Sequence, residues 1–453
     1  MTDFTAIDRY IEDHLDDSIE ELKRLCAQPS VSAQGLGIKE CAELVAEMLR
    51  SRGFKAEVIP TKGHPIVYGE ADGASDRALL FYNHYDVQPP EPLELWDSPP
   101  FEPTLRDGKL YARGVSDDKG HIQCRLSALD AVKAVTGRYP CKVKFVIEGE
   151  EETSSVNIVP FVEHNPQKLK ADGCVWEFGG VNHEGRPNQS LGMRGICYVE
   201  LVAQTGTLDA HSGLGGSIFP NAAWRLTWAL STLKGQDERI RIPGYYDNVR
   251  PPTKRDLELL AALPDDSEDM LKRYGLKGFL KGMKGGVDLQ REEVFMPTCT
   301  ICGLTSGYQG PGSKTVLPVQ ASAKVDFRLV PDQTPEEVLE KLRKHLDAEG
   351  FSDIEIKFLG GERPGRTDLD HPLVKLAIDT AREVYGKEPV VAPIIGGSGP
   401  NYVFLDSLKV PIITAGVGYP GSRAHAPNEN MVLENFVQGV KHTARILEEF
   451  GKR

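Results

Sequence analysis

The sequence predicts an α/β fold, with a discontinuous α/β/α domain at 1–188 and 362–453 and an inserted two-layer α+β domain at 189–361. Strand-like and helix-like segments alternate in the outer parts, whereas the stretch between them follows another order. Ligand-type side chains stand just past the apolar strand-like runs, where open α/β sheets carry their sites. The 453 residues suffice for two or three domains with a large core.

Composition and charge indicate an ordinary globular protein and argue against nucleic-acid and membrane partners. Apolar residues make up 40% of the chain and charged residues 26%, as in ordinary globular proteins. The net charge is −13 and no block of Lys and Arg occurs, so we expect no nucleic-acid partner and no membrane partner. No apolar run approaches the ~20 residues that span a bilayer. The start, "MTDFTAIDRY", is not a signal peptide, and the 8 scattered cysteines indicate reduced thiols in a cytoplasmic protein.

The first part of the outer domain alternates between helical and extended patterns. Apolar residues at helical spacing predict the helices, and short apolar runs bounded by Gly, Pro or charged residues predict the strands. The predicted segments are helices at 4–27 and 38–52, strands near 55–59, 66–69 and 78–84, a helix beginning at Asp117–Asp118 and a strand in "CKVKFVIEG".

The pattern changes after residue 188. "MRGICYVELVAQT" predicts a long strand and "PNAAWRLTWALSTLK" a helix, and a poorly patterned stretch covers 236–290. Two strands, a helix at 335–349 and the strand "DIEIKFL" follow. The order strand–helix–strand–strand–helix–strand predicts a ferredoxin-like module with its helices on one face. After "GGERPGRTDLDHP" the α/β pattern resumes.

Histidines and carboxylates gather where predicted strands end. His84 and Asp86 finish the strand in "FYNHYDVQPP", and four glutamates crowd "IEGEEETSS" directly after the next strand. Like charges this dense repel one another unless a cation neutralises some of them. Asp117 and His425, the latter in a glycine-rich loop after another apolar run, are candidate companions. Imidazoles and carboxylates in this pattern suit two zinc-type ions.

Together the motifs resemble one family, the co-catalytic dizinc family of aminoacylases, glutamate carboxypeptidases, acetylornithine deacetylases, succinyl-diaminopimelate desuccinylases and carnosine-type dipeptidases. The resemblance covers essentially the whole chain, and "RGICYVEL", "HSGLGGS" and "GSKTVLP" make the carnosine-dipeptidase-like branch the most similar. It implies a zinc-peptidase catalytic domain with an inserted lid and dimerisation domain. The motifs are "NHYDVQP", "LYARGVSDDKG", "IEGEEETSS", "MRGICYVELV" with "DAHSGLGGS", "GSKTVLP", "DFRLVPDQTPEEV" and "RAHAPNE".

The resemblance also implies a metal centre with two divalent ions, zinc or alternatively manganese or cobalt. Asp117 would bridge both ions and be followed by a cis peptide bond to Asp118. Asp86 would orient the imidazole of a ligand, and Glu151 would be the general base that activates a water shared by the ions. The implied metal ligands are His84, Asp117, Glu152, Glu177 and His425.

Further residues are implied to hold the substrate. His211 would reach across a dimer interface and help to hold the oxyanion of the tetrahedral intermediate. Arg328 would bind the substrate carboxylate together with Thr315, Gly396 and Gly397. On sequence grounds alone, a plain ion pair inside the sheet is an equally good interpretation of Arg328.

We therefore expect a homodimeric dizinc amidohydrolase, paired through the inserted domain, that cleaves dipeptides or short peptides with a free carboxylate. The alternative is an N-acyl-amino-acid deacylase of the acetylornithine or succinyl-diaminopimelate type, because Glu177 stands where dipeptidases usually carry Asp. A more remote alternative is a non-catalytic nucleotide- or partner-binding protein. "SGYQGPGSKT" nearly spells a phosphate-binding loop, but Ser313 replaces the glycine required before Lys314.

Overall fold

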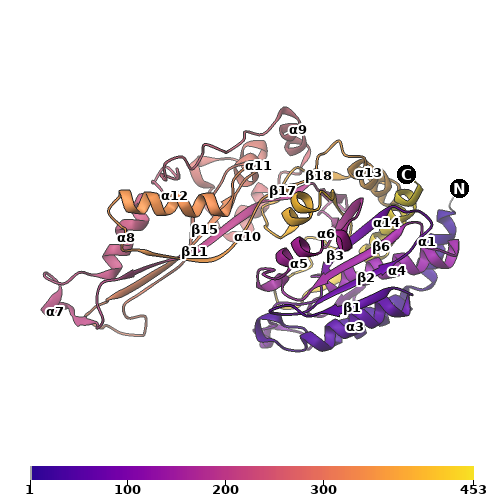
Figure 1. Ribbon diagram of the computed structural model, residues 1–453, viewed down its shortest axis with the longest axis horizontal. Coiled ribbons are helices and arrows are strands. Elements are labelled where there is room, and N and C mark those ends of the chain that lie inside the picture. The colour runs from indigo at the N-terminus through magenta and orange to yellow at the C-terminus, as the bar shows by residue number, and fades with distance from the viewer. Residues whose placement is uncertain (1–2, 453) are drawn as a thin grey trace. The chain divides into compact units, whose positions relative to one another are not determined.

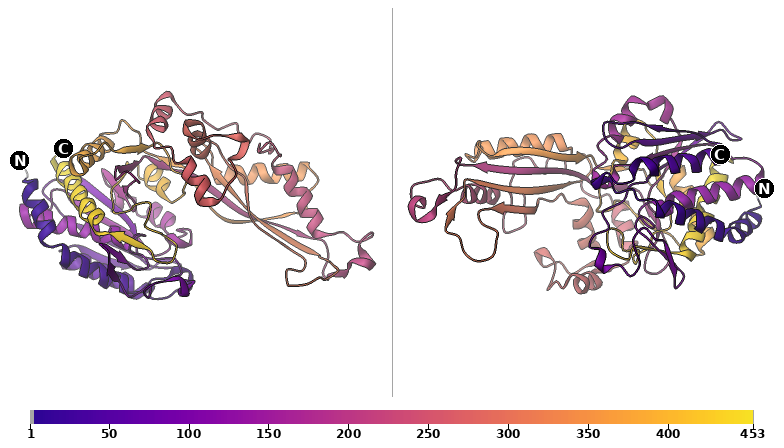
Figure 2. Two further views of the ribbon diagram at one scale, coloured as in Figure 1. Left: turned by 180° about the vertical axis from the view of Figure 1, so that it is seen from behind. Right: turned by 90° about the horizontal axis from the view of Figure 1, so that it is seen from below.

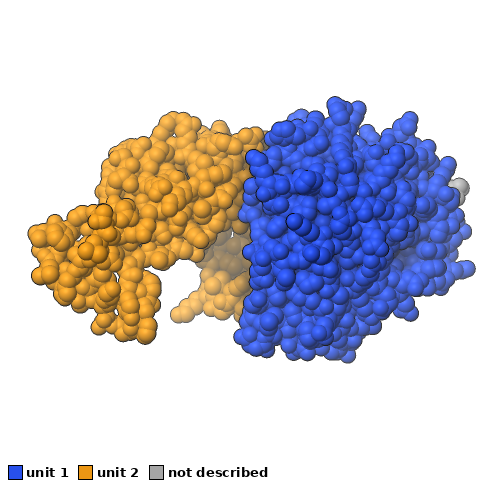
Figure 3. Space-filling model, turned by 60° about the horizontal axis from the view of Figure 1, so that its bottom comes forward, with its two compact units in different colours: residues 1–192, 366–393, 399–453 blue, residues 193–365, 394–398 orange. Residues whose placement is uncertain are grey.

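The computed structural model describes residues 3–452, which form two compact units (Figures 1 and 3). Unit 1 comprises the chain up to Gly192 together with 366–393 and the part that follows from Gly399, and unit 2 comprises 193–365 and 394–398. The short segment Ile394–Ser398, expected in the outer domain, thus belongs to unit 2. Its backbone explains this, because Ile395 pairs with Met193 at the start of that unit.

Unit 1 is built on a six-stranded sheet in the order β1-β2-β6-β3-β7-β19. β3 lies parallel to β6 and β7, and β19 lies parallel to β7, whereas β1 and β2 are antiparallel to their neighbours. Every residue of β3 is buried, as expected for a central strand. The strands are β1 (Lys55–Ile59), β2 (Ile66–Ala71), β3 (Ala78–His84), β6 (Lys142–Glu148), β7 (Gly173–Trp176) and β19 (Ile412–Thr414).

Smaller sheets and several helices complete unit 1. The minor strands are β4 (Thr104–Arg106), β5 (Lys109–Tyr111) and β20 (Asn430–Val432) in one sheet, and β8 (Gly180–Val181), β9 (Pro187–Ser190) and β18 (Val390–Ala392) in another. The helices are α1 (Phe4–Asp13), α2 (Leu15–Ala27), α3 (Ile38–Ser51), α4 (Lys119–Thr136), α5 (Ile158–His164), α6 (Pro166–Leu169), α13 (Pro372–Tyr385) and α14 (Leu433–Lys452).

Helix α4 packs on β3, and α1, α2 and α14 pack on α4 (Figures 1 and 2). The helices from the two ends of the chain are joined by paired hydrogen bonds, since both terminal nitrogens of Arg445 lie 2.8 Å from the carboxylate of Asp8. The helix predicted over 4–27 is interrupted at His14, whose ring stacks on Tyr10 and whose backbone leaves the helical conformation. No described helix is long and apolar enough to cross a bilayer.

Unit 2 contains an antiparallel sheet in the order β13-β15-β11-β16. Helices α8 and α12 contribute to the same apolar cluster as alternate residues of β11 and β15, so both helices cover one face of the sheet. The elements follow one another in the predicted order. They are β11 (Gly195–Gln204), α8 (Ala222–Leu233), β13 (Thr300–Ser306), β15 (Gln320–Leu329), α12 (Pro335–Ala348) and β16 (Glu355–Glu362).

Two additions extend this module. At one end, β12 pairs with β14 beside the short helix α7, and the stretch without a clear pattern in the sequence forms α9, α10 and α11. β10 and β17 contain the points where the chain passes between the units. The bounds are β10 (Gly192–Met193), β12 (Ala210–His211), α7 (Ser212–Gly215), α9 (Lys254–Ala262), α10 (Ser267–Tyr274), α11 (Gly286–Phe295), β14 (Val316–Leu317) and β17 (Gly365–Arg366).

Candidate metal centre

The sheet of unit 1 brings the predicted ligands to one edge. β3 and β6 are parallel with His84 opposite Glu148, so the residues that follow both strands emerge together. β7 is parallel to β3 and ends at Trp176, directly before Glu177. Carboxyl ends of parallel strands meet at the same edge of a sheet, and this places His84, Glu177 and the glutamates after β6 around one space.

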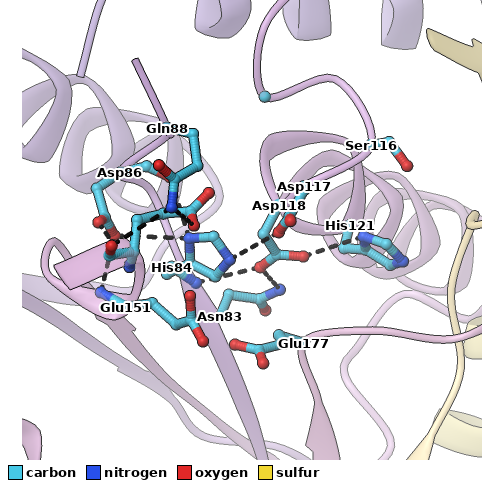
Figure 4. A network of polar contacts seen from close by, with 12 residues as sticks. Asn83, His84, Asp86, Gln88, Ser116, Asp117, Asp118, His121, Glu151 and Glu177 are labelled. Carbon is cyan, nitrogen blue, oxygen red and sulfur yellow. Dashed lines mark hydrogen bonds and ion pairs between the residues drawn. The ribbon is translucent and has the colours of Figure 1, made fainter. Parts of the chain in front are cut away.

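Asp117 lies between two imidazoles (Figure 4 draws the His84 side). Its Oδ1 is 3.0 Å from Nε2 of His84, and its Oδ2 is 2.8 Å from Nε2 of His425. The same His425 nitrogen is 3.2 Å from Oε2 of Glu152. Ligand atoms of Asp117, Glu152 and His425 all lie within 4.8 Å of one another, as a shared cation would require. Two imidazoles that face different oxygens of one carboxylate form the pattern of a bridged metal pair.

The charges of the centre fit divalent cations. Hydrogen bonds to Asp117 and Glu152 raise the pKa of His425 to about 10, so without cations this imidazole would have to balance the carboxylates. Burial, and then the nearby Glu151, raise the pKa of Glu177 well above its usual value. Oε2 of Glu177 is buried and accepts no hydrogen bond from any residue that the structure describes. Such an oxygen suits a metal ligand.

Asp86 supports the ligands rather than facing the cavity. Its two carboxylate oxygens accept hydrogen bonds from the backbone N–H of Glu151, at 3.2 Å, and of Glu152, at 3.1 Å. Nδ1 of His84 lies 3.0 Å from the backbone oxygen of Asp86 and 3.5 Å from its Oδ1. The side chain is fully buried. Asp86 therefore fixes the imidazole orientation and also ties the end of β3 to the glutamate turn.

Further contacts behind the predicted ligands come from Asn83, Asp118 and His121, to whose side chains the sequence analysis assigned no role (Figure 4). Oδ2 of Asp118 accepts hydrogen bonds from Nδ2 of Asn83, at 2.7 Å, and from the backbone N–H of His84, at 3.1 Å. Oδ1 of Asp118 lies 3.0 Å from Nδ1 of His121. The peptide bond between Asp117 and Asp118 is cis, as the resemblance predicted. The carboxylates of Asp117 and Asp118 face different partners.

Glu429 anchors the loop that carries Asp117. Its fully buried carboxylate accepts hydrogen bonds from the backbone N–H of Gly114, Ser116 and Asp117, at 2.9, 2.9 and 3.0 Å. Nη1 of Arg113, itself buried, lies 2.7 Å from Oε2 of Glu429. Glu429 directly precedes β20, and α14 begins only at Leu433. The sequence offered one sign of this anchoring role, because Glu429 is the acidic residue that ends the "RAHAPNE" motif.

Glu151 is positioned to exchange protons. Burial, and then the negative charges of Asp117 and Glu152, raise its pKa to about 8 against the opposing effect of His84. No residue among 3–452 donates a hydrogen bond to its carboxylate. By contrast, Glu150 accepts hydrogen bonds from the backbone N–H of His64 and from Asn157, so its carboxylate is already engaged. A cavity of about 330 Å³ opens at the site and is lined by Glu151 with His84, Asp117, Glu177 and His425.

The predicted substrate-binding residues fall into two groups within unit 2. Oγ1 of Thr315 lies 3.3 Å from Nε2 of His211, next to the β12–β14 pair. Arg328 stands at the other end of β15, where its Nη1 is 2.8 Å from Oγ of Ser398 in the glycine loop that includes Gly396 and Gly397. The 10 residues of β15 span about 30 Å at ~3.3 Å per residue. One chain thus does not bring Thr315 and Arg328 together.

The chain is similar to several known proteins over almost its full length. It is 26% identical to the Beta-Ala-His dipeptidase of Rattus norvegicus, with 98% of this chain and 95% of that protein covered. It is also 26% identical to the Cys-Gly metallodipeptidase dug1 of Schizosaccharomyces pombe, with 95% of each covered. The solved structure of the M20 family metallo-carboxypeptidase Sso-CP2 from Sulfolobus solfataricus is 39% identical, with a TM-score of 0.92 and 96% of this chain and 99% of that chain covered.

The family assignment rests on the greater part of the sequence. Residues 80–449 match the model of peptidase family M20/M25/M40, and this range runs from β3 to α14 and includes each of the predicted metal ligands. The resemblance and the α/β fold class predicted from the sequence are confirmed. The protein therefore belongs to peptidase family M20/M25/M40, and it is a metallopeptidase.

Proposed function

We propose that the protein is a dizinc amidohydrolase that cleaves dipeptides or short peptides with a free C-terminal carboxylate. The placement of Asp117 between His84 and His425, one imidazole facing each oxygen, carries the proposal. The names of the similar proteins, two dipeptidases and a carboxypeptidase, support a substrate whose cleaved amide lies next to a terminal carboxylate. The cysteines, unpaired in the structure, support our assignment to the cytoplasm.

Five residues would hold two ions. His84 and Glu177 would bind one, His425 and Glu152 the other, and Asp117 both. This nitrogen and oxygen donor set suits zinc and also accepts manganese or cobalt. When bound, the ions supply Lewis-acid polarisation of the scissile carbonyl and lower the pKa of water.

Glu151 would carry the proton through the reaction. Its carboxylate would take a proton from the attacking water and deliver it to the nitrogen of the departing amine. The raised pKa of about 8 arises in part from the charges of Asp117 and Glu152, so cations that neutralise these two carboxylates would lower the pKa of Glu151. A pKa near the working pH suits a group that must both accept and release a proton.

Substrate preference tests this proposal directly. We expect the purified enzyme to cleave dipeptides with a higher kcat/KM than the matching N-acetyl and N-succinyl amino acids, with metal content measured in the same samples. By the family resemblance, Glu177 is typical of both carboxypeptidases and deacylases, so the acylated amino acids are the necessary comparison. Faster cleavage of the acylated amino acids would replace the dipeptidase assignment with the deacylase one.

We further propose that unit 2 pairs two subunits and that His211 and Thr315 act at the partner's metal centre. The region around His211 exposes large apolar side chains, and the rings of Trp224 and Trp228 on α8 are stacked and more than half exposed. Exposed apolar clusters of this kind mark interaction surfaces. A two-fold pairing would give each partner the same role. The other exposed apolar side chains are Leu208, Leu214, Ile218 and Phe219.

Mixing two inactive variants tests the exchange of His211. His211→Ala keeps an intact metal centre, and Glu151→Gln keeps His211, so a heterodimer contains one complete site. An equimolar mixture should recover about one quarter of wild-type activity, because half of the dimers are mixed and each of these has one working site. Loss of an oxyanion contact should lower the His211→Ala parent by about 10²–10³-fold.

A second mixture provides the matched control. Glu151→Gln and Asp117→Asn both damage the same metal centre, so their heterodimers contain no complete site and should stay inactive. If subunit exchange is verified by differently tagged chains and the His211→Ala mixture also stays inactive, His211 does not act in trans.

A further inference from the structure

The face of the unit 2 sheet that lies opposite α8 and α12 carries an oppositely charged pair. Ile196 of β11 pairs with Arg328 of β15 on one side and with Glu362 of β16 on the other. Directly paired residues point to the same face of a sheet. Cys197, the next residue of β11, lies in the apolar cluster under α8 and α12, so Ile196, Arg328 and Glu362 lie on the opposite face.

Arg328 has one edge available for an anion. Its Nε lies 3.1 Å from Oδ2 of Asp326, and its Nη1 lies 2.8 Å from Oγ of Ser398. Among the described residues, none accepts a hydrogen bond from its Nη2, and the side chain is 32% exposed. A guanidinium fixed at two nitrogens and open at the third is preorganised for a carboxylate.

Glu362 lies on the same face and feels the charge of Arg328, but it has no hydrogen-bond partner among the described residues. Burial raises its pKa to about 7 against the lowering effect of Arg328. Two positions before Glu362 on β16 there is room, because Gly360 pairs with Tyr198 and a Cβ atom added at Gly360 would meet no atom within 4 Å. A half-buried carboxylate beside open space is poised for a cation that the chain itself does not supply.

We propose that Glu362 is a specificity-determining residue that binds a cationic side chain on the substrate residue whose carboxylate Arg328 holds. Two strand spacings of ~4.8 Å separate Arg328 from Glu362, about 10 Å between their backbones. The α-carboxylate and the side-chain cation of one lysine or arginine residue can bridge such a gap when the two protein side chains reach inward. The inference rests on the proposed function, since it takes Arg328 as the carboxylate-binding group.

Matched substrates test the charge preference. Ala-Lys, Ala-norleucine and Ala-Glu share the cleaved bond, and norleucine is lysine without its amine. We expect the wild-type enzyme to prefer Ala-Lys to Ala-norleucine by about 10-fold in kcat/KM, mainly through KM, and to disfavour Ala-Glu. Glu362→Gln should remove the preference for Ala-Lys, and Glu362→Lys should favour Ala-Glu. Glu355→Gln, at the exposed far end of β16, should leave the ratios as in the wild type.

The ratios of kcat/KM between these substrates distinguish a specificity role of Glu362 from a role as counter-ion of Arg328. An equal loss on all three substrates in Glu362→Gln would mean that Glu362 acts only as a counter-ion of Arg328, and it would overturn the proposal. The proposal would also be overturned if a correctly folded, metal-loaded Glu362→Gln variant kept the wild-type ratios of kcat/KM between the three substrates. If the wild type cleaves no dipeptide, the proposed dipeptidase function fails by itself. The same comparison then uses N-acetyl-lysine and N-acetyl-norleucine, or the dissociation constants of free lysine and norleucine.

Discussion

Glu151→Gln is expected to lower kcat by about 10²–10⁴-fold while leaving metal content at the wild-type level. Glutamine has nearly the same shape as glutamate but cannot accept the proton of the attacking water. The backbone N–H of Glu151 donates to Asp86, and this contact persists in the variant. The turn that also carries Glu152 should therefore keep its geometry. Steady-state kinetics and metal analysis of the same preparation measure both quantities.

A matched exchange outside the site controls for general effects of the substitution. Glu163→Gln changes an exposed carboxylate of α5 in the same unit and should keep full activity. Activity near the wild-type level in Glu151→Gln would show that another group is the base. Glu150 is a poor substitute, because its two oxygens already accept hydrogen bonds from His64 and Asn157.

Asp117→Asn should deplete both metal ions, whereas Glu177→Gln should deplete mainly one. Asp117 faces both imidazoles with separate oxygens, and an asparagine offers only one oxygen acceptor. We expect Asp117→Asn to lose about 10³-fold or more in kcat/KM, the order expected when metal-assisted charge stabilisation is lost. Metal content by elemental mass spectrometry, before and after dialysis against a chelator, distinguishes the variants.

The fold of the Asp117→Asn variant must be measured, to show that any metal loss is not caused by misfolding. Glu429 binds the backbone N–H of Asp117 rather than its side chain, so the loop should survive the substitution and circular dichroism should match the wild type. A chelated enzyme with full activity would refute the metal centre. Equal metal loss in the two variants would refute the bridging role of Asp117.

The strand pattern predicted a candidate metal centre because His84 and the glutamate cluster each follow a short, buried, apolar strand that ends at His84 or at Glu148. The family resemblance, rather than the strand pattern, added Glu177 and the separate roles of the predicted ligands. The supporting residues are less visible. Asn83, Asp118 and Glu429 act through contacts to backbone atoms or to each other, and single polar residues in loops carry no period that reveals such contacts.

The poorly patterned stretch 236–290 of unit 2 shows a second reason why part of the fold could not be predicted from the sequence. α9 begins with a capping box between Thr253 and Asp256, a local signal, but its apolar contacts come from distant positions. Leu260 of α9 packs with Val294 of α11 and with Ile394, which follows more than 90 residues later. Short helices that depend on such distant partners have weak periodicity of their own. The same long-range packing accounts for Ile394–Ser398 joining unit 2.

The contact between Glu429 and the loop of Asp117 can form only late in the synthesis of the chain. The loop of Asp117 and the carboxylate that anchors it are 312 residues apart in the chain. At ~5–20 residues per second, a ribosome needs about 15 to 60 s to synthesise the chain from Asp117 to Glu429. β19 and His425 arrive in the same late portion. A nascent chain therefore emerges with four of the five proposed ligands, without His425 and with no anchored loop, and a product that terminates before these residues would hold no complete centre. The proposed centre can form only after the ribosome has added His425 and Glu429.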